Sequence, residues 1–411
     1  MCPSCNITAM GSTENKPTSE MRRLALAGIF VNAGVHIVLY VLPLAPFAIK
    51  GYADFASFYT AGRIVESGKA ADLYDYETQW QVQQECCRVP IRSSLLPYVH
   101  AAYEALVFVP LALLPYPAAY VVWTALNVGV LLLIAFLLRQ YLRPLLPHWS
   151  LLTVAAVASF PFLIMFAQGQ DSLLLALIYS AVFVFLKAGR PYEAGACLSM
   201  GMFKPQLVVP FVIVLLLRKA WKPIFGFLLG AIALGIISVA TMGESVVWGY
   251  FEFLRKFDRM PAEISGAWPK QMLNLRGLLA ILLERFVSPE IVTGLVVLAS
   301  IAVIWIASRR NDDNLESQFS FALTATMLAS YHFNSHDAVL LILPAVLGFS
   351  TLRARPAKIT LYVATASWFI WPAMFLLVKY SLLGVLGFLV VAFAVAFWLE
   401  TPRPEISGIA G

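Results

Sequence analysis

Residues 24–49 read LALAGIFVNAGVHIVLYVLPLAPFAI, and this stretch decides the class of fold. A helix that crosses the hydrocarbon core of a bilayer needs about 20 predominantly apolar residues. The only ionisable side chain in the run is His36, and Arg22 and Arg23 stand directly before it. The apolar region of a cleaved secretory signal is shorter, about 7–15 residues. We therefore predict a retained membrane span.

The composition extends this prediction to the whole chain. Of 411 residues, 60% are hydrophobic and 13% are charged, whereas about 25% of an ordinary soluble domain is charged. These values exclude a disordered chain and argue against a soluble enzyme. The formal net charge is +6, which we assign to short loops between spans rather than to a surface that binds nucleic acid. Five cysteines are too few for a disulfide-stapled scaffold.

Further apolar runs predict an all-α integral membrane protein, a multi-spanning helical bundle. They cover residues 117–138, 150–167, 171–187, 222–242, 291–307, 318–331, 337–350, 359–378 and 381–399. Shorter runs occupy 103–114 and 192–218, and the second is split at Lys204-Pro205. Such short runs are typical of half-helices or re-entrant segments, which need protein or a wet cavity around them. Together the runs predict about twelve crossings.

The basic residues of the short loops predict the orientation, because lysine and arginine concentrate on the cytoplasmic side. The groups on that side are Arg22 and Arg23; Arg139 and Arg143; Lys187 and Arg190; Arg218, Lys219 and Lys222; and Arg353, Arg355 and Lys358. The segments 51–102 and 243–290 then face outward, and interfacial helices are expected in them. We predict a single membrane domain over residues 23–400, between cytoplasmic tails at 1–22 and 401–411.

The first outer segment contains Asp54-Phe55-Ala56-Ser57-Phe58-Tyr59-Thr60-Ala61-Gly62. Its aromatic residues and Gly62 recur at helical spacing, which predicts an amphipathic helix at the membrane surface with Asp54 at its start. Asp54 could only cap this helix, or its carboxylate could take a proton from a hydroxyl group. The residues alone leave both interpretations open.

Two polar interruptions of the apolar pattern are candidates for ligand contacts. Gln168-Gly169-Gln170-Asp171-Ser172 forms an outer turn, where the side chains could bind hydroxyl groups or Asp171 could cap the next helix. Lys204 lies within an apolar stretch, where a lysine is costly unless it has a partner or water. Pro205 breaks the helix there. A fixed ammonium at this break suits a phosphate, and a snorkelling lysine at a hairpin tip is the alternative.

A third cluster is Tyr331-His332-Phe333-Asn334-Ser335-His336-Asp337. His332 and His336 are four residues apart, as in some metal sites. No third ligand is evident nearby, so we favour a proton relay or a hydroxyl binder. In the second outer segment, Lys270, Asn274 and Arg276 could meet phosphate or sugar, or form a solvated face. All the clusters fall on the predicted outer side, which favours one shared site.

The order of these motifs resembles glycosyltransferase family 87, a family of the GT-C superfamily that includes polyprenol-phosphate-mannose-dependent mannosyltransferases. The resemblance rests on Asp54 to Gly62 with Leu73-Tyr74-Asp75, on Tyr98-Val99-His100, on Gly169-Gln170-Asp171-Ser172, on Lys204-Pro205, on Asn274 to Gly277, and on His336-Asp337 before Leu340-Leu341-Ile342-Leu343-Pro344. It covers residues 50–350. Ala101 and Ala102 depart from a Pro-containing tract of the family, which leaves the role of His100 open.

The resemblance implies a hexosyltransferase of the plasma (inner) membrane with its active site on the periplasmic or extracellular face. The donor would be a polyprenyl-phosphate sugar, expected to carry mannose, and the acceptor a lipid or a glycan. Transfer would invert the anomeric centre without a metal or other cofactor. Asp54 would be the general base, and His336 would orient the acceptor or Asp54. The phosphate would meet Lys204, Arg276 and Lys270, and the substrate contacts would be Gln170, Asp171, His332, Asn334, Asn274 and Tyr59.

A transporter or lipid flippase is the alternative, with Lys204 and Gln170 lining a substrate path. Such a protein should show internal symmetry and polar residues at several depths of the membrane. This chain instead concentrates its polar residues at one interface. A scaffold without catalytic activity would leave Lys204 unexplained, so glycosyl transfer is the favoured interpretation.

Overall fold

The computed structural model describes residues 19–86, 95–257, 268–310, 314–377 and 386–400. Within these ranges the secondary structure is helical and contains no strand. The tail expected at 401–411 lies outside the described residues. So does the tail expected at 1–22, except that the first helix already begins at Ser19.

The described residues form a succession of α-helices and short helical turns. They are α1 (Ser19–His36), α2 (Leu42–Phe47), α3 (Phe55–Glu66), α4 (Tyr76–Cys86), α5 (Ala102–Ala112), α6 (Tyr116–Leu137), α7 (Arg139–Leu142), α8 (Leu151–Val157), α9 (Phe160–Gln168), α10 (Ser172–Lys187), α11 (Pro191–Ser199), α12 (Pro205–Leu217), α13 (Trp221–Met242), α14 (Glu244–Phe257), α16 (Leu275–Leu283), α17 (Pro289–Arg309), α18 (Leu315–Ala329), α19 (Ile342–Thr351), α20 (Arg355–Leu377) and α21 (Gly387–Leu399). The π-helical turns are η1 (Ile37–Val41) and η2 (Ala48–Tyr52), and the 3-10 turns are η3 (Ala70–Asp72), η4 (Met200–Phe203), η5 (Pro269–Gln271) and η6 (Asp337–Leu341).

In the described part of the chain, four helical segments are long and apolar enough to cross a membrane. They are Leu26–Glu66, Tyr116–Leu137, Trp221–Met242 and Pro289–Arg309. The pair α8–α9 is a fifth candidate, although it is bent by 81°. Ser159 is extended there, and Pro161 lies in the first turn of α9, which explains why the expected run at 150–167 is broken. Shorter apolar helices such as α5, α10 and α12 complete a multi-pass membrane protein.

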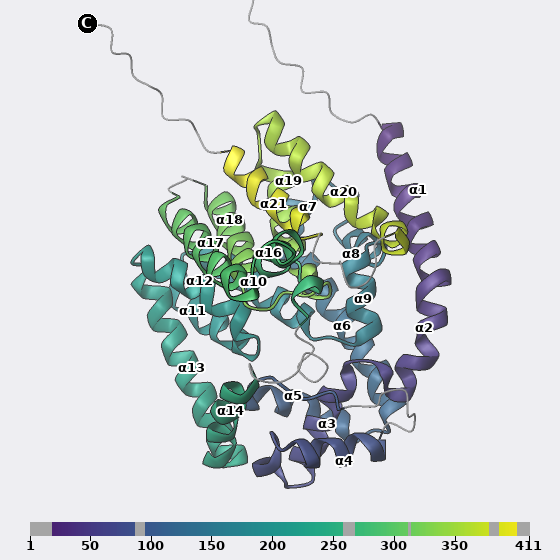
Figure 1. The fold of residues 1–411 in the computed structure, drawn as a ribbon. Helices are drawn as coiled ribbons and strands as arrows, with labels where there is room; N and C mark the ends of the chain where they lie inside the picture. Colours follow the sequence, from purple (N-terminus) through teal and green to yellow (C-terminus); the bar gives the residue numbers. More distant parts are fainter. Residues whose placement is uncertain (1–18, 87–94, 258–267, 311–313, 378–385, 401–411) are drawn as a thin grey trace, which may run out of the picture.

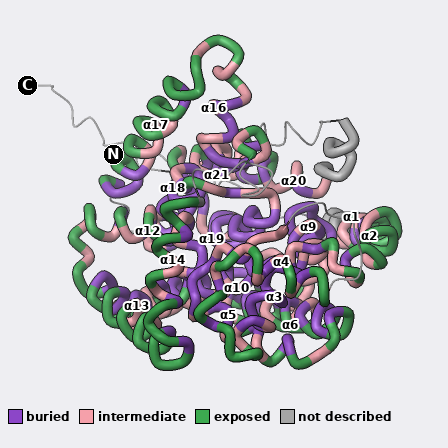
Figure 2. The backbone as a smooth tube through the Cα atoms, turned by 60° about the horizontal axis from the view of Figure 1, so that its bottom comes forward, coloured by how far each residue is buried: buried purple, intermediate pink, exposed green. Residues whose placement is uncertain are grey.

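Two of the long helices, α1 and α13, lie at opposite edges of the molecule (Figure 1). α1 and α2 run down one edge, α13 runs down the opposite edge to α14, and α3 and α4 lie at the lower end (Figure 1). α19 and the start of α20 lie at the upper end. Figure 2 shows that the edge helices are mostly exposed whereas α10 is buried in the centre. Large apolar side chains such as Val31 and Ile236 are exposed on these edges, as lipid-facing helices require.

The helix expected at the membrane surface is instead part of the protein core. α3 begins after Asp54, as predicted, but most of its residues are buried, including Phe55 and Ala61 at 0% exposure. It packs so closely on α5 that a Cβ on Gly62 would lie 2.6 Å from the carbonyl oxygen of Phe108. The same residue spacing suits an apolar protein neighbour and a lipid surface, so the sequence pattern could not separate the two.

Two hydrophobic clusters form the core, and the polar residues lie where the clusters meet. One cluster contains Phe55 and Tyr98, and the other contains Leu173, Phe203 and Ala338. The polar candidates adjoin these residues in the sequence: Asp54, Ser172, Lys204 and Asp337. Each polar side chain is therefore held by an apolar neighbour that is packed in place.

α11 and α13 approach closely because glycines stand at their contact. A Cβ on Gly226 would lie 2.0 Å from the carbonyl oxygen of Tyr192, and one on Gly195 would lie 1.8 Å from that of Pro223. Gly226 and Gly230 are four residues apart on α13, the spacing of small residues at membrane helix contacts.

We predict that Gly226→Val destabilises the protein, because overpacking a close contact costs about 1–3 kcal/mol or more. Gly235→Val on the same helix is the control, since no atom lies within 4 Å of the Cβ added there. The measurement is the thermal unfolding of each purified protein in one detergent. Equal melting temperatures for the two variants would contradict the close contact.

Candidate active site

A cavity of about 990 Å³ lies at the junction of the two clusters. Its polar lining consists of Asp54, Ser57, His100, Gln168, Gln170, Lys204, Gln206, Gln271, His332, Asn334, Ser335, His336 and Asp337. An apolar wall comes from Leu39, Tyr40, Pro43, Leu44, Phe160 and Ile164, and aromatic side chains come from Tyr250, Trp268 and Tyr331. The predicted proton acceptor, Asp54, and the predicted cation, Lys204, thus line the same cavity.

Asp54 is held as a cavity-lining carboxylate rather than as a helix cap. It occupies the N-cap position of α3, yet its side chain makes no capping hydrogen bond. Its Oδ2 accepts a hydrogen bond of 2.8 Å from Nε2 of Gln170. The interpretation that the Asp54 side chain only caps α3 is therefore wrong.

Gln170 is aimed at Asp54 by the shape of the turn that precedes α10. Gly169 has a φ of 62°, a conformation that glycine adopts without steric cost. A Cβ at this position would lie 2.7 Å from Cβ of Phe55, so the turn rests directly against α3. Nε1 of Trp123 donates to the Gly169 carbonyl oxygen over 2.8 Å. The turn is thus fixed from two sides.

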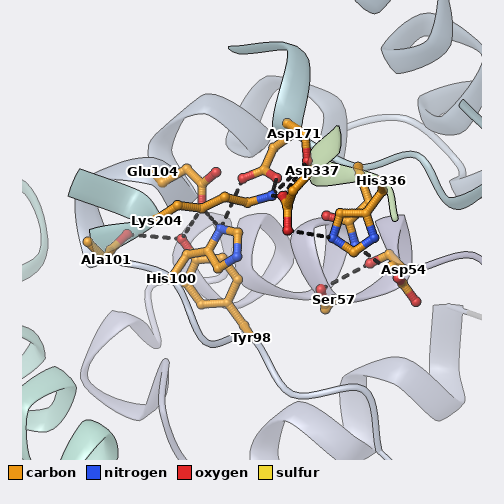
Figure 3. Close-up of polar contacts among 12 residues, drawn as sticks. Asp54, Ser57, Tyr98, His100, Ala101, Glu104, Asp171, Lys204, His336 and Asp337 are labelled. Atoms are coloured by element: carbon orange, nitrogen blue, oxygen red, sulfur yellow. Dashed lines mark hydrogen bonds and ion pairs between the residues drawn. The ribbon is translucent and has the colours of Figure 1, made fainter. Parts of the chain in front are cut away.

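The side chain of Lys204 is 3% exposed, and its ammonium is surrounded by acceptors. It lies 2.8 Å from Oδ1 of Asp171, 2.7 Å from Oδ1 of Asp337 and 2.8 Å from Oγ of Ser172. Figure 3 shows it between the two carboxylates. The ammonium donates hydrogen bonds to Asp337 and Ser172 and forms an ion pair with Asp171. The partner that a membrane lysine requires is therefore an acid pair.

His100 extends this network on the far side of Asp171. Its Nδ1 lies 2.7 Å from Oε2 of Glu104 and 3.1 Å from Oδ2 of Asp171. The hydroxyl of Tyr98 also donates to Oε2 of Glu104, over 3.2 Å. Burial alone would lower the pKa of His100, but the two carboxylates outweigh it and raise the pKa to about 10. The two carboxylates thus favour the charged form of the His100 ring.

Among the described residues, His100, Glu104 and Asp171 could also offer ligands to a metal, since their donor atoms lie within 4.8 Å of one another. The 2.7 Å contact from the ring nitrogen to Glu104 is a hydrogen bond, and the 3.1 Å contact to Asp171 is an ion pair. The ammonium of Lys204 brings a positive charge to within 2.8 Å of Asp171 in this group.

The two histidines of the third cluster line the cavity in their neutral form. Burial lowers the pKa of His332 to about 4 and also lowers the pKa of His336. Nε2 of His332 accepts from Nδ2 of Asn334 over 2.7 Å. Nδ1 of His336 lies 2.9 Å from Oε1 of Gln168, so the neutral ring donates its Nδ1–H to that amide oxygen. A neutral imidazole ring can donate a hydrogen bond to a hydroxyl group or accept one from it.

Some residues expected in the site lie outside the lining of the cavity. The hydroxyl of Tyr59 donates to the carbonyl oxygen of Leu114, and Asn274 caps α16 by accepting from the Gly277 amide. Lys270 pairs with Glu284 over 2.8 Å. The guanidinium of Arg276 lies 4.3 Å from the ring centre of Tyr331, which does line the cavity, so Arg276 is one side chain away.

Glu104, Ser172 and Asp337 belong to the polar network but were not assigned roles from the sequence. Glu104 is the clearest omission, because it is an acid in the apolar run 103–114 and is 1% exposed. The argument that singled out Lys204, that an ionisable residue in a membrane segment needs a partner, applies equally to Glu104.

We predict that Lys204→Met lowers the stability strongly, because it leaves Asp171 and Asp337 buried without their counter-ion. Removing one partner of a buried ion pair costs about 3–5 kcal/mol. Adding Asp337→Asn to Lys204→Met should restore part of the loss. Thermal unfolding of the purified proteins measures both effects.

The matched control is Lys270→Met, whose half-exposed pair with Glu284 should contribute at most about 1 kcal/mol. An equally small effect of Lys204→Met would show that the acid pair does not depend on Lys204.

Residues 101–330 match glycosyltransferase family 87, which is more than half of the chain. No curated protein and no solved structure matches the chain. The matched segment contains Glu104, Asp171 and Lys204, whereas Asp54 precedes it and His336 follows it. This match and the multi-pass helical fold identify a membrane glycosyltransferase, so the chain belongs to glycosyltransferase family 87.

Proposed function

We propose that the cavity transfers a sugar from a polyprenyl-phosphate donor to a hydroxyl group of a lipid or glycan acceptor, with Asp54 as the general base. The observation that supports this proposal is the cavity shared by Asp54, the Lys204 network and an apolar wall. The polar end suits a sugar and an acceptor hydroxyl, and the apolar wall suits the chain of a lipid-linked donor. Membership of a transferase family disfavours the transporter alternative.

The reaction would be a single displacement at the anomeric carbon. The acceptor oxygen forms a bond to that carbon, the bond from the carbon to the phosphate oxygen breaks, and the hydroxyl proton passes to Asp54. A single displacement inverts the anomeric centre, and mannose is the sugar that the resemblance suggests. His336 and His332, both neutral, would hold sugar or acceptor hydroxyls together with Asn334.

The contacts of the cations suggest how the donor phosphate is held. Lys204 keeps its donors on protein acceptors, so we propose that it fixes the two carboxylates and acts on the phosphate through the network. Arg276 stacks over Tyr331 at the edge of the cavity, and it can reach a phosphate without breaking a buried ion pair. We therefore place Arg276 before Lys270, which Glu284 pairs.

We further propose about twelve crossings, with both termini cytoplasmic and the cavity open to the periplasmic or extracellular side of the plasma (inner) membrane. In support, the first turn of α1 and the last turn of α21 lie at the upper end of the molecule, opposite α3, α4 and α14 (Figure 1). α13 follows the basic loop at 218–222 and runs toward the lower end.

We predict that Asp54→Asn reduces transfer by about 100-fold or more, the scale on which general bases contribute. The assay supplies a polyprenyl-phosphate sugar and candidate acceptors to the protein in lipid. Asp72→Asn, an exposed acid of the same segment outside the cavity, is the control. Full activity of Asp54→Asn with an intact fold would move the base to another residue, first to His336.

We also propose that Gln170 positions Asp54, since its amide fixes one carboxylate oxygen. Gln170→Glu then places two carboxyl groups against each other, which favours protonation of the pair. We predict that the acidic limb of the pH dependence of kcat/KM moves to higher pH. Gln206→Glu adds the same charge to the same cavity and should move the limb less. Equal displacements would show that Gln170 has no special contact with Asp54.

A further inference from the structure

A second cavity, of about 430 Å³, lies at the other end of α10. Ser172 at the start of α10 contacts Lys204 in the candidate active site, and Lys187 at its end lines this second cavity. α10 has 16 residues, which span about 24 Å at the rise of an α-helix. The second cavity is therefore separate from the catalytic machinery.

The lining of this cavity is amphipathic. Its cations are Arg139 at the start of α7, Arg143 directly after α7, and Lys187 at the end of α10. All three side chains are exposed at the rim. Its apolar surface comes from Leu137, Phe183 and Val184, and Phe183 is fully buried beneath it. A charged rim over an apolar floor matches a ligand with an anionic head and an apolar body.

Contacts within the protein orient two of the three cations, Arg139 and Lys187. Arg139 donates to the carbonyl oxygen of Phe136 over 2.9 Å, and its guanidinium lies 4.1 Å from the centre of the Phe136 ring. Lys187 pairs with Glu316 over 2.7 Å, and the hydroxyl of Tyr141 donates to the same carboxylate oxygen. Side chains fixed in this way lose less rotamer freedom when a ligand binds.

The charge of the cavity is positive after its neighbours are counted. The three cations face the single carboxylate of Glu316 and the C-terminal ends of α6 and α10. Each helix end contributes about −0.5 of a charge, so the balance is about +1. This balance suits a single phosphodiester anion.

We propose that this cavity binds the phosphate group of an acidic membrane lipid, with the phosphate at the rim and the lipid body against Leu137 and Val184. Basic pockets between membrane helices bind such head groups, and each lysine or arginine near the surface contributes to the attraction. The alternative is that Arg139 and Lys187 only complement the negative helix ends. Measuring lipid binding separates this structural role from a lipid site. The site is independent of the proposed glycosyl transfer.

The test compares the full-length protein with the double variant Arg139→Gln/Arg143→Gln, which removes two cations of the cavity and leaves the Lys187–Glu316 pair. The control is Arg353→Gln/Arg355→Gln, which removes the same charge at the start of α20 outside the cavity. Native mass spectrometry in detergent titrates phosphatidylglycerol, phosphatidylcholine and inorganic phosphate against each protein. Thermal unfolding in phosphatidylcholine confirms that all three are folded.

We expect the Arg139/Arg143 variant to bind phosphatidylglycerol about tenfold more weakly or worse, whereas the control matches the parent protein. Phosphatidylcholine carries no net charge, so the parent protein and both double variants should bind it equally. Competition by millimolar inorganic phosphate would identify the free anion as a second source of the same chemistry, and no competition would restrict the site to the lipid. Equal binding of phosphatidylglycerol by both double variants would overturn the proposal.

Discussion

The buried ammonium of Lys204 is the interaction on which the site depends. Taking its charge and two carboxylates out of water costs several kcal/mol for each ion, so none of the three is tolerable without the others. The ions come from three separate segments: the turn before α10, the break before α12 and the turn η6. These segments must therefore assemble together, and they bring Gln170 and His336 to the cavity along with their charged neighbours.

The helix dipoles explain the positions of the two acids but oppose that of the lysine. Asp171 and Asp337 stand at the N-terminal ends of α10 and η6, where the partial positive charge favours a carboxylate. Lys204 stands at the N-terminal end of α12, where the same partial charge disfavours a cation. The two acids thus stabilise the lysine although the dipole of its own helix destabilises it. The acids in turn leave little net positive potential near Lys204, and this argues for a phosphate position nearer Arg276 and Tyr331.

The sequence predicted the local events that single residues impose and missed those that depend on a neighbour. The break at Lys204-Pro205 and the helix start after Asp54 were predictable because proline and helix periodicity act locally. The burial of α3 was not, since it depends on α5. Tyr59 lies on the predicted helix, but its hydroxyl is turned to the carbonyl oxygen of Leu114, far along the chain. No pattern in the sequence encodes that partner.

The apolar wall of the cavity supports a donor that arrives from the membrane. Leu39 and Leu44 line the cavity, and they are also 59% and 37% exposed at the edge of the molecule. The wall formed by η1 and α2 is therefore one helix thick, and the same side chains face the cavity and the lipid. π-helical turns and an internal proline, Pro46, weaken the hydrogen bonding of this helix. A long apolar chain can lie against such a wall while its phosphate stays at the polar end, whereas a soluble nucleotide sugar would leave the wall without a function.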